Sequence, residues 1–452
     1  MTWTLRSRPP PGIEGLPVVG VLPRIIRDPL RFALDVRRRL GDMVRFRLGP
    51  FRVYLVSHPD GVRHVLQENA RNYVKGLDTQ LLKILLGDGL LTSEGDFWRR
   101  QRRLAQPVFQ PRRLAALAAT MVETTQEMLE RWRAPAGRGA GVDLAAEMRR
   151  LTLDIVARAL FHTDVHAEAE AVSRAVEDAN EALNARSLIP VDLPGWVPYP
   201  GRGRLRRAIE TLDAIVYRMI EARRGARGRA PDLLTHLLEA RDEETGETMS
   251  DAQLRDEVLT IFLAGHETTA NALAFTFHAL DRHPDVARAV DDEIASVLAG
   301  RAPGPEDVPR LERTGRAIEE SLRLFPPAWG VTRTPLAADE VLGYRVEPGS
   351  IVMLSQYVVH RHPDFWEDPE RFDPDRFLPE RSASRPRFAY FPFGGGPRIC
   401  IGGAFATVEM TLIVALVRQA FDLRLESGRP LELDARITLR PRGALPARLI
   451  PR

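Results

Sequence analysis

The segment 391–405, Phe-Pro-Phe-Gly-Gly-Gly-Pro-Arg-Ile-Cys-Ile-Gly-Gly-Ala-Phe, constrains this chain more than any other. It contains Cys400, the only cysteine, so no internal disulfide and no cysteine-rich metal site can form. The glycines at 394–396 allow close backbone approach to a flat group, and an apolar run at 404–421 predicts a helix. A thiol before a helix is expected to have a lowered pKa. The loop suits either an iron-bound thiolate or a free cysteine packed as a small hydrophobe.

Five residues of this segment resemble the haem-binding signature of the cytochrome P450 family. The pattern is Phe393-x-x-Gly396-x-Arg398-x-Cys400-x-Gly402. The resemblance implies that haem b is the cofactor and that the thiolate of Cys400 is the axial ligand of its iron. In this family the thiolate ligand favours O–O cleavage.

The same resemblance implies one domain, residues 1–452, of a mainly α fold with a smaller β region (α+β). The β-rich part is expected at about 40–60, 330–400 and 425–450, and the remainder is expected to be helical. The haem is expected between a long central helix and the helix after Cys400. Hydrophobic residues make up 44% of the chain and charged residues 28%, which suits a globular protein with a sizeable core.

The central helix is predicted at 251–281, where the apolar pattern is longest and a capping-box signal precedes it. Its middle reads Ala264-Gly265-His266-Glu267-Thr268, which resembles the oxygen-activation motif A-G-x-E-T of the family. By this resemblance Gly265 leaves room for dioxygen, and Glu267 and Thr268 relay protons. Threonines in buried helices also bond back to the i−4 carbonyl for purely structural reasons. A zinc hydrolase is excluded, because H-E-x-x-H needs a second histidine where alanine stands.

Four further residues are assigned to the haem by the resemblance. Trp98 and Arg102 share one face of a predicted helix and can reach one target, a haem propionate. Arg333 and Arg398 match the other arginines that hold propionates. Without the resemblance, the residue types favour a solvated basic helix face for Trp98 and Arg102.

A structural lock is predicted on the cysteine side of the cofactor. Glu320 and Arg323 lie one helical turn apart, and by resemblance Arg376 shares the carboxylate of Glu320. An exposed pair of this kind contributes only ~0.2–0.5 kcal/mol. The pair therefore indicates a lock only together with the segment that contains Arg376.

The substrate pocket is predicted from apolar residues on several segments. A mobile loop with a short helix at 74–91 and a proline-rich lid loop at 187–201 are expected near its entrance. The predicted lining residues are Leu77, Leu82, Leu86, Phe262, Ala264, Ala328, Val331 and Ile437.

Charge and length limit the partners. A net charge of +3 gives no reason to expect nucleic acid. The N-terminus lacks an apolar signal core, and no run approaches the ~20 apolar residues of a membrane span, so we expect a cytoplasmic protein without a membrane anchor. Too few residues follow Cys400 for a fused flavin reductase, so electrons are expected from a ferredoxin or flavodoxin with its reductase. A candidate docking patch, or equally a set of solvated arginines, consists of Arg99, Arg100, Arg103, Arg112 and Arg113.

The function implied is that of a haem-thiolate monooxygenase. It inserts one atom of O2 into a hydrophobic small molecule by hydroxylation or epoxidation, and a fatty acid, a terpenoid or another secondary metabolite all remain open as substrates. The alternatives are a haem-thiolate peroxygenase or isomerase, and a non-catalytic haem protein. The intact Glu267-Thr268 pair argues against both.

Overall fold

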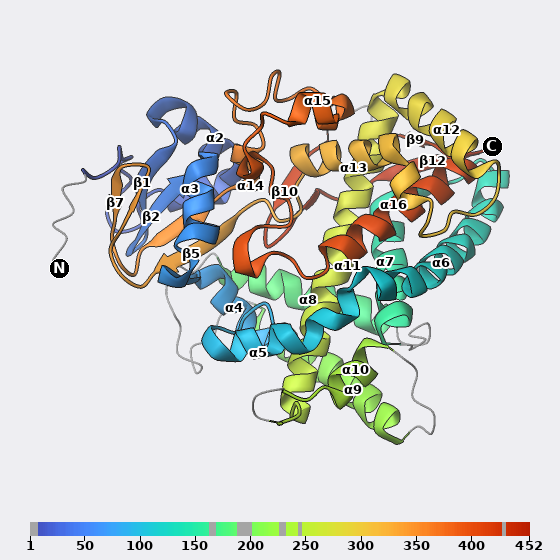
Figure 1. Ribbon diagram of the computed structural model, residues 1–452, viewed down its shortest axis with the longest axis horizontal. Coiled ribbons are helices and arrows are strands. Elements are labelled where there is room, and N and C mark those ends of the chain that lie inside the picture. The colour runs from blue at the N-terminus through green and yellow to red at the C-terminus, as the bar shows by residue number, and fades with distance from the viewer. Residues whose placement is uncertain (1–7, 162–168, 188–200, 226–231, 243–245, 427–430) are drawn as a thin grey trace.

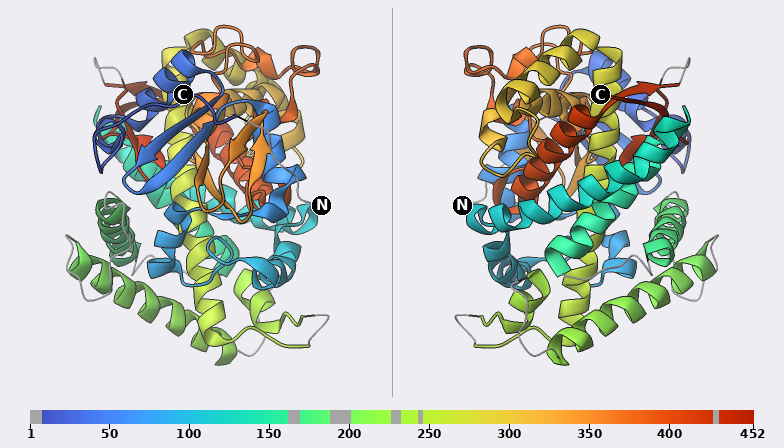
Figure 2. Two further views of the ribbon diagram at one scale, coloured as in Figure 1. Left: turned by 90° about the vertical axis from the view of Figure 1, so that its left-hand side faces the viewer. Right: turned by 90° about the vertical axis from the view of Figure 1, so that its right-hand side faces the viewer.

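The computed structural model describes residues 8–161, 169–187, 201–225, 232–242, 246–426 and 431–452. Figure 1 shows a β-rich part, which contains the N-terminal strands, beside a larger helical part with α11 at its centre. Figure 2 shows from two further sides that α9 and α8 lie at the end of the helical part away from the C-terminus. The predicted fold class, mainly α with a smaller β region, is confirmed.

The helices carry most of the described chain. In the N-terminal third they are α1 (Leu22–Arg27), α2 (Pro29–Leu40), α3 (Pro59–Arg63), α4 (Leu77–Leu86), α5 (Gly95–Ala105), α6 (Pro111–Gly137) and α7 (Leu144–Phe161). The next are α8 (Ala169–Ser187), α9 (Arg202–Gly225), α10 (Leu233–Glu239), α11 (Asp251–Arg282), α12 (Pro284–Leu298) and α13 (Glu312–Leu324). The last are α14 (Gln356–Val359), α15 (Pro379–Ser382) and α16 (Gly403–Ala420).

The strands form one larger sheet and three small ones. The larger sheet has the order β1 (Met43–Leu48), β2 (Phe51–Val56), β8 (Ile351–Leu354), β5 (Val331–Pro335) and β3 (Tyr73–Lys75). A second sheet joins β4 (Gly141–Asp143), β12 (Pro446–Pro451) and β9 (Phe421–Leu425). Two hairpins complete the set, β6 (Asp339–Val341) with β7 (Tyr344–Val346) and β10 (Leu433–Ala435) with β11 (Leu439–Pro441).

The central helix α11 forms where the sequence predicts it. The hydroxyl of Ser250 accepts from the backbone N–H of Gln253, and the Gln253 side chain accepts from the backbone N–H of Ser250, so the predicted capping box is complete. Most residues of α11 are buried, and the helix packs against α7, α13 and α16. It therefore supports a site built inside the helical part.

The helix α16 follows the cysteine loop and is also a core helix. Among the residues that the structure describes, it alone is long and apolar enough to cross a membrane, and 61% of it is buried within the protein. It contacts α6, α11, α12 and α13, so its apolar surface is used in packing.

The β-rich ranges need two corrections. Strands predicted across 330–400 end at Leu354, because the Ser355 side chain caps α14 and short helices follow. The strands β3 and β4 were not predicted, since three residues are too short to show an alternating pattern. The predicted mobile loop at 74–91 contains α4, and the predicted lid at 187–201 falls almost entirely on residues outside the described ranges.

Candidate active site

The glycine-rich loop before α16 places Cys400 on a tight backbone turn. Gly394 and Gly396 have φ angles of 74° and 66°, in the left-handed region that favours glycine. A Cβ on Gly396 would lie 1.7 Å from the carbonyl oxygen of Leu66, so no larger residue fits there. The Cys400 amide donates to the carbonyl of Phe393 over 2.9 Å, and the Cys400 side chain is exposed. The loop thus presents the thiol to open space.

The thiol does not have the lowered pKa that its position before a helix predicts. Although the sulfur borders open space, protein surrounds it on its other sides, and this desolvation raises the pKa of Cys400. The backbone N–H of Gly402 and the charge of Arg102 act in the opposite direction but are the smaller effects. Because a metal ligand must be a thiolate, bonding to iron has to supply the remaining stabilisation of the charged form.

The oxygen motif lies on α11, which packs against α16, the helix that follows this loop. Ala264 is exposed, although the residues of α11 around it are mostly buried. Figure 1 shows α11 and α16 side by side, and the two helices contact each other. Cys400, just before α16, and Ala264 on α11 are both exposed, although both of these helices are largely buried. An exposed thiol at this position suits a ligand bonded through sulfur.

Gly265 lies against a neighbouring helix. A Cβ at this position would lie 3.1 Å from the side chain of Val156 on α7, so the glycine permits close packing of α7 on α11, and its role in leaving room for dioxygen stays a prediction. His266 is buried beside it, and its carbonyl accepts from the hydroxyl of Thr152 over 2.9 Å. Burial lowers the pKa of His266, which suits a neutral packing residue.

Glu267 and Thr268 have separate partners. The hydroxyl of Thr268 donates to the carbonyl of Ala264 over 2.7 Å, the back-bond typical of threonine in a helix. The carboxylate of Glu267 accepts from Thr438 over 2.6 Å and from Asn180 over 2.8 Å. No sequence motif marks Asn180, which lies in the amphipathic helix α8. Thr438 follows the predicted pocket residue Ile437, and no sequence motif marks the threonine itself.

The predicted propionate ligand Arg398 is already paired within the chain. Its guanidinium makes two bonds to the carboxylate of Glu94, one of them at 2.7 Å. The guanidinium carbon also lies 5.1 Å from the ring centre of Trp98, which is buried on α5. Arg102, four residues later, donates to the carbonyl of Ile399 over 2.7 Å and so lies beside the cysteine loop. The two predicted α5 residues therefore both reach the 398–400 segment.

Lys75 is a site residue that the sequence reasoning missed. It exposes only 7% of its surface, and its ammonium group donates to the carbonyls of Leu90 and Ser93 at 3.0 and 2.7 Å. Desolvation lowers the pKa of Lys75 to about 7, and the charges of Arg398 and Arg333 add to this effect. The sequence contains one indication of its importance: the chain has only two lysines, and both lie in 75–83.

These cations fit the acidic groups of haem b. With Lys75 protonated, three positive charges (Lys75, Arg333 and Arg398) act on one another near two carboxylates, Glu94 and Glu257. Burial raises the pKa of Glu257 to about 8, so this acid is mostly neutral at pH 7. The cluster therefore carries surplus positive charge, which the paired propionates of a haem would balance.

The predicted lock residues meet in the core. Arg323 donates from two nitrogens to the carboxylate of Glu320, at 2.6 and 2.8 Å, and both side chains are fully buried. Arg376 donates to the same carboxylate over 3.3 Å, and the backbone N–H of Asp373 donates over 2.8 Å. Breaking such a cluster costs far more stability than breaking an exposed pair, because the removal of one member leaves a buried charge without its partner.

The predicted pocket residues divide into two groups. Leu86 and Phe262 are buried in the helical core, with Phe262 packed beside a histidine ring, so their side chains offer little surface to a substrate. The others are exposed or partly exposed, on α4, on β5 and the segment before it, and on the turn before β11: Leu77, Leu82, Ala328, Val331 and Ile437. Because α4 contacts both α11 and β5, these elements can enclose one ligand.

The arginines of the candidate docking patch are only partly available to a partner protein. Arg100 and Arg103 form ion pairs with the buried carboxylate of Asp242, at 3.5 and 3.1 Å, and Arg99 pairs with Asp96 of its own helix. Arg100 is 16% exposed, so it offers little surface to a partner. The side chain of Arg112 lies outside the described residues.

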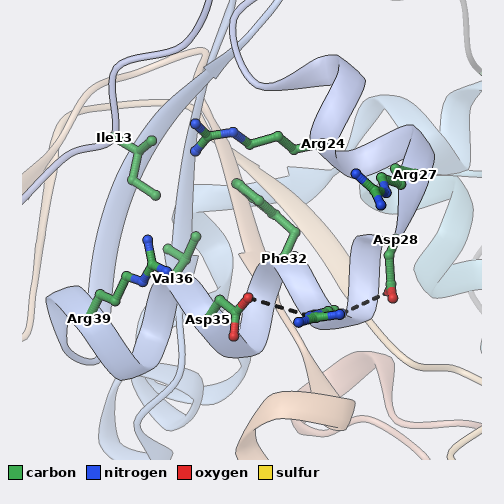
Figure 3. Close-up of a pocket in the computed structure, with 9 residues that line it drawn as sticks. Ile13, Arg24, Arg27, Asp28, Phe32, Asp35, Val36 and Arg39 are labelled. Carbon is green, nitrogen blue, oxygen red and sulfur yellow. Dashed lines mark hydrogen bonds and ion pairs between the residues drawn. The ribbon is translucent and has the colours of Figure 1, made fainter.

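A separate surface pocket of about 390 Å³ lies beside α1 and α2 (Figure 3). Its lining is rich in arginine, and Figure 3 shows Arg24, Arg27 and Arg39 around Phe32. None of the residues that line it comes from α11 or the cysteine loop, so it is not part of the site described above.

Comparison with known proteins agrees with this geometry. The chain is 40% identical to cyclooctatin synthase of Streptomyces melanosporofaciens, over 97% of this chain and 94% of the relative. It is 37% identical to cyclooctat-9-en-7-ol 5-monooxygenase of the same organism, over 95% and 92%. The crystal structure of the cytochrome P450DA haem domain matches 99% of this chain and 98% of that one, with a TM-score of 0.89 and 28% identity.

The family description "Cytochrome P450" matches residues 9–445, nearly the whole chain. Members of this family carry a haem with a thiolate ligand, receive electrons from a redox partner and oxidise hydrophobic substrates with O2. The chain belongs to the cytochrome P450 family and is a monooxygenase.

Proposed function

We propose that this enzyme hydroxylates a cyclic terpenoid, with haem b bound through the thiolate of Cys400. The observation that carries the proposal is the exposed thiol of Cys400 before α16, a helix that packs against α11, together with a cluster of surplus positive charge that includes Arg398. The substrate class is supported by the relative that acts on cyclooctat-9-en-7-ol, an unsaturated alcohol. The half-exposed pocket residues, Leu77, Leu82, Ala328, Val331 and Ile437, are apolar and suit such a molecule.

When bound, the haem would supply the activation of O2 and the insertion of one of its atoms into the substrate, the other atom leaving as water. The residues of the chain would bind and orient the haem and deliver protons. Lys75 and Arg333 hold the propionates, while Arg398 and Glu94 keep the surrounding charges in place, and Phe393 and Gly402 shape the loop around the sulfur. Glu267 supplies protons, and the hydroxyl of Thr268 passes them on after it leaves the carbonyl of Ala264.

We further propose that a ferredoxin or flavodoxin, with its reductase, supplies the electrons in the cytoplasm. Arg99 and Arg103 are 58% and 50% exposed on α5, the helix that also reaches the 398–400 segment. An acidic partner that docks on them would lie on the helix that reaches the cysteine loop.

Two measurements test the proposal. The reduced carbonyl complex of the haem-loaded protein should show the red-shifted Soret band of thiolate ligation, and Cys400→Ala should remove it. A screen of cyclic terpenoids, beginning with cyclooctat-9-en-7-ol, should give a hydroxylated product with O2 and a surrogate ferredoxin system. A wild-type protein that is loaded with haem but lacks the band would refute the cofactor assignment, and product formation with peroxide only would indicate a peroxygenase.

A further inference from the structure

The carboxylate of Glu267 is held by donors from two segments that are far apart in the sequence. Asn180 of α8 donates its side-chain amide to one oxygen over 2.8 Å. Thr438, in the turn between β10 and β11, donates its hydroxyl to the other oxygen over 2.6 Å. Each carboxylate oxygen therefore has its own neutral donor, and α8, α11 and the C-terminal turn meet at this one side chain.

The direction of the Thr438 hydroxyl is fixed by a third residue. The side-chain amide of Asn271, one turn after Glu267 on α11, donates to the hydroxyl oxygen of Thr438 over 3.4 Å. Because a hydroxyl has one proton, Thr438 then directs that proton at Glu267. The turn itself is anchored, since the backbone N–H of Leu439 donates to the carbonyl of Pro327 over 2.8 Å.

Thr268 is not part of this arrangement. Its hydroxyl is engaged by the carbonyl of Ala264, so the orientation of Glu267 is set by other residues. We propose that Asn180 and Thr438 are positioning residues for Glu267, and that the delivery of protons to Thr268 depends on their two hydrogen bonds. This inference rests on the proposed function, in which Glu267 is the proton source.

The same arrangement connects the carboxylate to the substrate pocket. Ile437 precedes Thr438 and is 37% exposed, as expected for a side chain that a substrate can cover. A substrate that presses on Ile437 acts directly on the turn that carries one of the two donors. Proton delivery then responds to how well the substrate fills the pocket.

The test removes each donor without changing the size of the side chain greatly. Thr438→Val and Asn180→Leu each leave one carboxylate oxygen without its donor, whereas Thr438→Ser keeps the hydroxyl and should rescue. Thr211→Val, which removes a hydroxyl bonded to the i−4 carbonyl on the surface of α9, is the control. The infrared carboxylate band of Glu267, assigned by difference from Glu267→Gln, should shift in the two donor variants and in neither of the others.

Turnover gives the second measurement. With cyclooctat-9-en-7-ol and a surrogate ferredoxin system, product formed per O2 should fall roughly tenfold in Thr438→Val and Asn180→Leu, with a matching rise in hydrogen peroxide, because a bond to a charged group is lost. The inference is overturned if Glu267→Gln releases peroxide while both donor variants keep normal coupling and an unshifted band. If Glu267→Gln itself keeps normal coupling, the proposed proton role of Glu267 is what fails.

Discussion

The buried lysine at the edge of the site leads to a quantitative prediction. Lys75→Met keeps a long unbranched side chain in a position that is 7% exposed but removes the ammonium group. If that group donates to a haem propionate, its loss removes a charge-assisted hydrogen bond worth about 1.5–3 kcal/mol. The affinity for haem should therefore fall roughly 10- to 100-fold.

The same residue predicts how haem affinity depends on pH. Burial lowers the pKa of Lys75 to about 7 without haem, and a bound carboxylate raises it, so binding above this pH requires uptake of a proton. The affinity should be highest below pH 7 and should fall as pH rises, by at most about tenfold per pH unit for one proton. Methionine binds no proton, so this part of the pH dependence should disappear in Lys75→Met.

The assay is the rate of haem transfer to excess apomyoglobin, measured at pH values on both sides of 7. Lys83→Met provides the matched control, because Lys83 is the other lysine of the chain and its ammonium group pairs with Asp88 over 2.6 Å on the surface of α4. It should behave as the wild type does. Equal transfer rates and equal pH dependence for Lys75→Met and the wild type would refute the reasoning.

Three further predictions concern the lock, the cysteine loop and the proton relay. Glu320→Ala leaves buried guanidinium groups without their carboxylate, so thermal unfolding should show a loss of about 3–5 kcal/mol, against less than about 0.5 kcal/mol for Glu130→Ala in an exposed pair. Gly396→Ala should abolish haem incorporation, measured by absorbance, because its Cβ would meet backbone at 1.7 Å, whereas Gly394→Ala, with nothing within 4 Å, should lose only about 1–2 kcal/mol from its positive φ. Thr268→Ala should divert O2 to hydrogen peroxide with little change in melting temperature, and unchanged coupling would contradict the relay.

The parts of the fold that the sequence predicts well are those with a local cause. The capping box at Ser250 and the long apolar pattern after it place α11 correctly to within one residue at its C-terminal end. The glycines around Cys400 predict a tight turn, because glycine readily adopts the positive φ angles that such a turn requires and other residues rarely do. In both cases the determining interaction lies within a few positions along the chain.

The parts that escaped prediction depend on contacts between distant segments. Nothing near Asn180 in the sequence indicates that its side chain reaches a carboxylate 87 residues away. The close approach of Val156, which belongs to a different helix, to Gly265 could likewise not be predicted from the residues around the glycine. The raised pKa of Cys400 could not be predicted for the same reason. The helix after the cysteine can be predicted from the sequence, but the surrounding protein that desolvates the sulfur cannot.

Arg398 has a partner that the motif around it does not indicate. The motif implies that its guanidinium holds a propionate, and the structure pairs this guanidinium with the carboxylate of Glu94. Glu94 also accepts from the backbone N–H of Lys75 over 2.6 Å, and although burial opposes the change, these bonds lower the pKa of Glu94. Arg398 therefore acts on the strand that carries Lys75 through Glu94. The positive charge of the cluster is set by this connected group, so the contribution of any one of its members depends on the others.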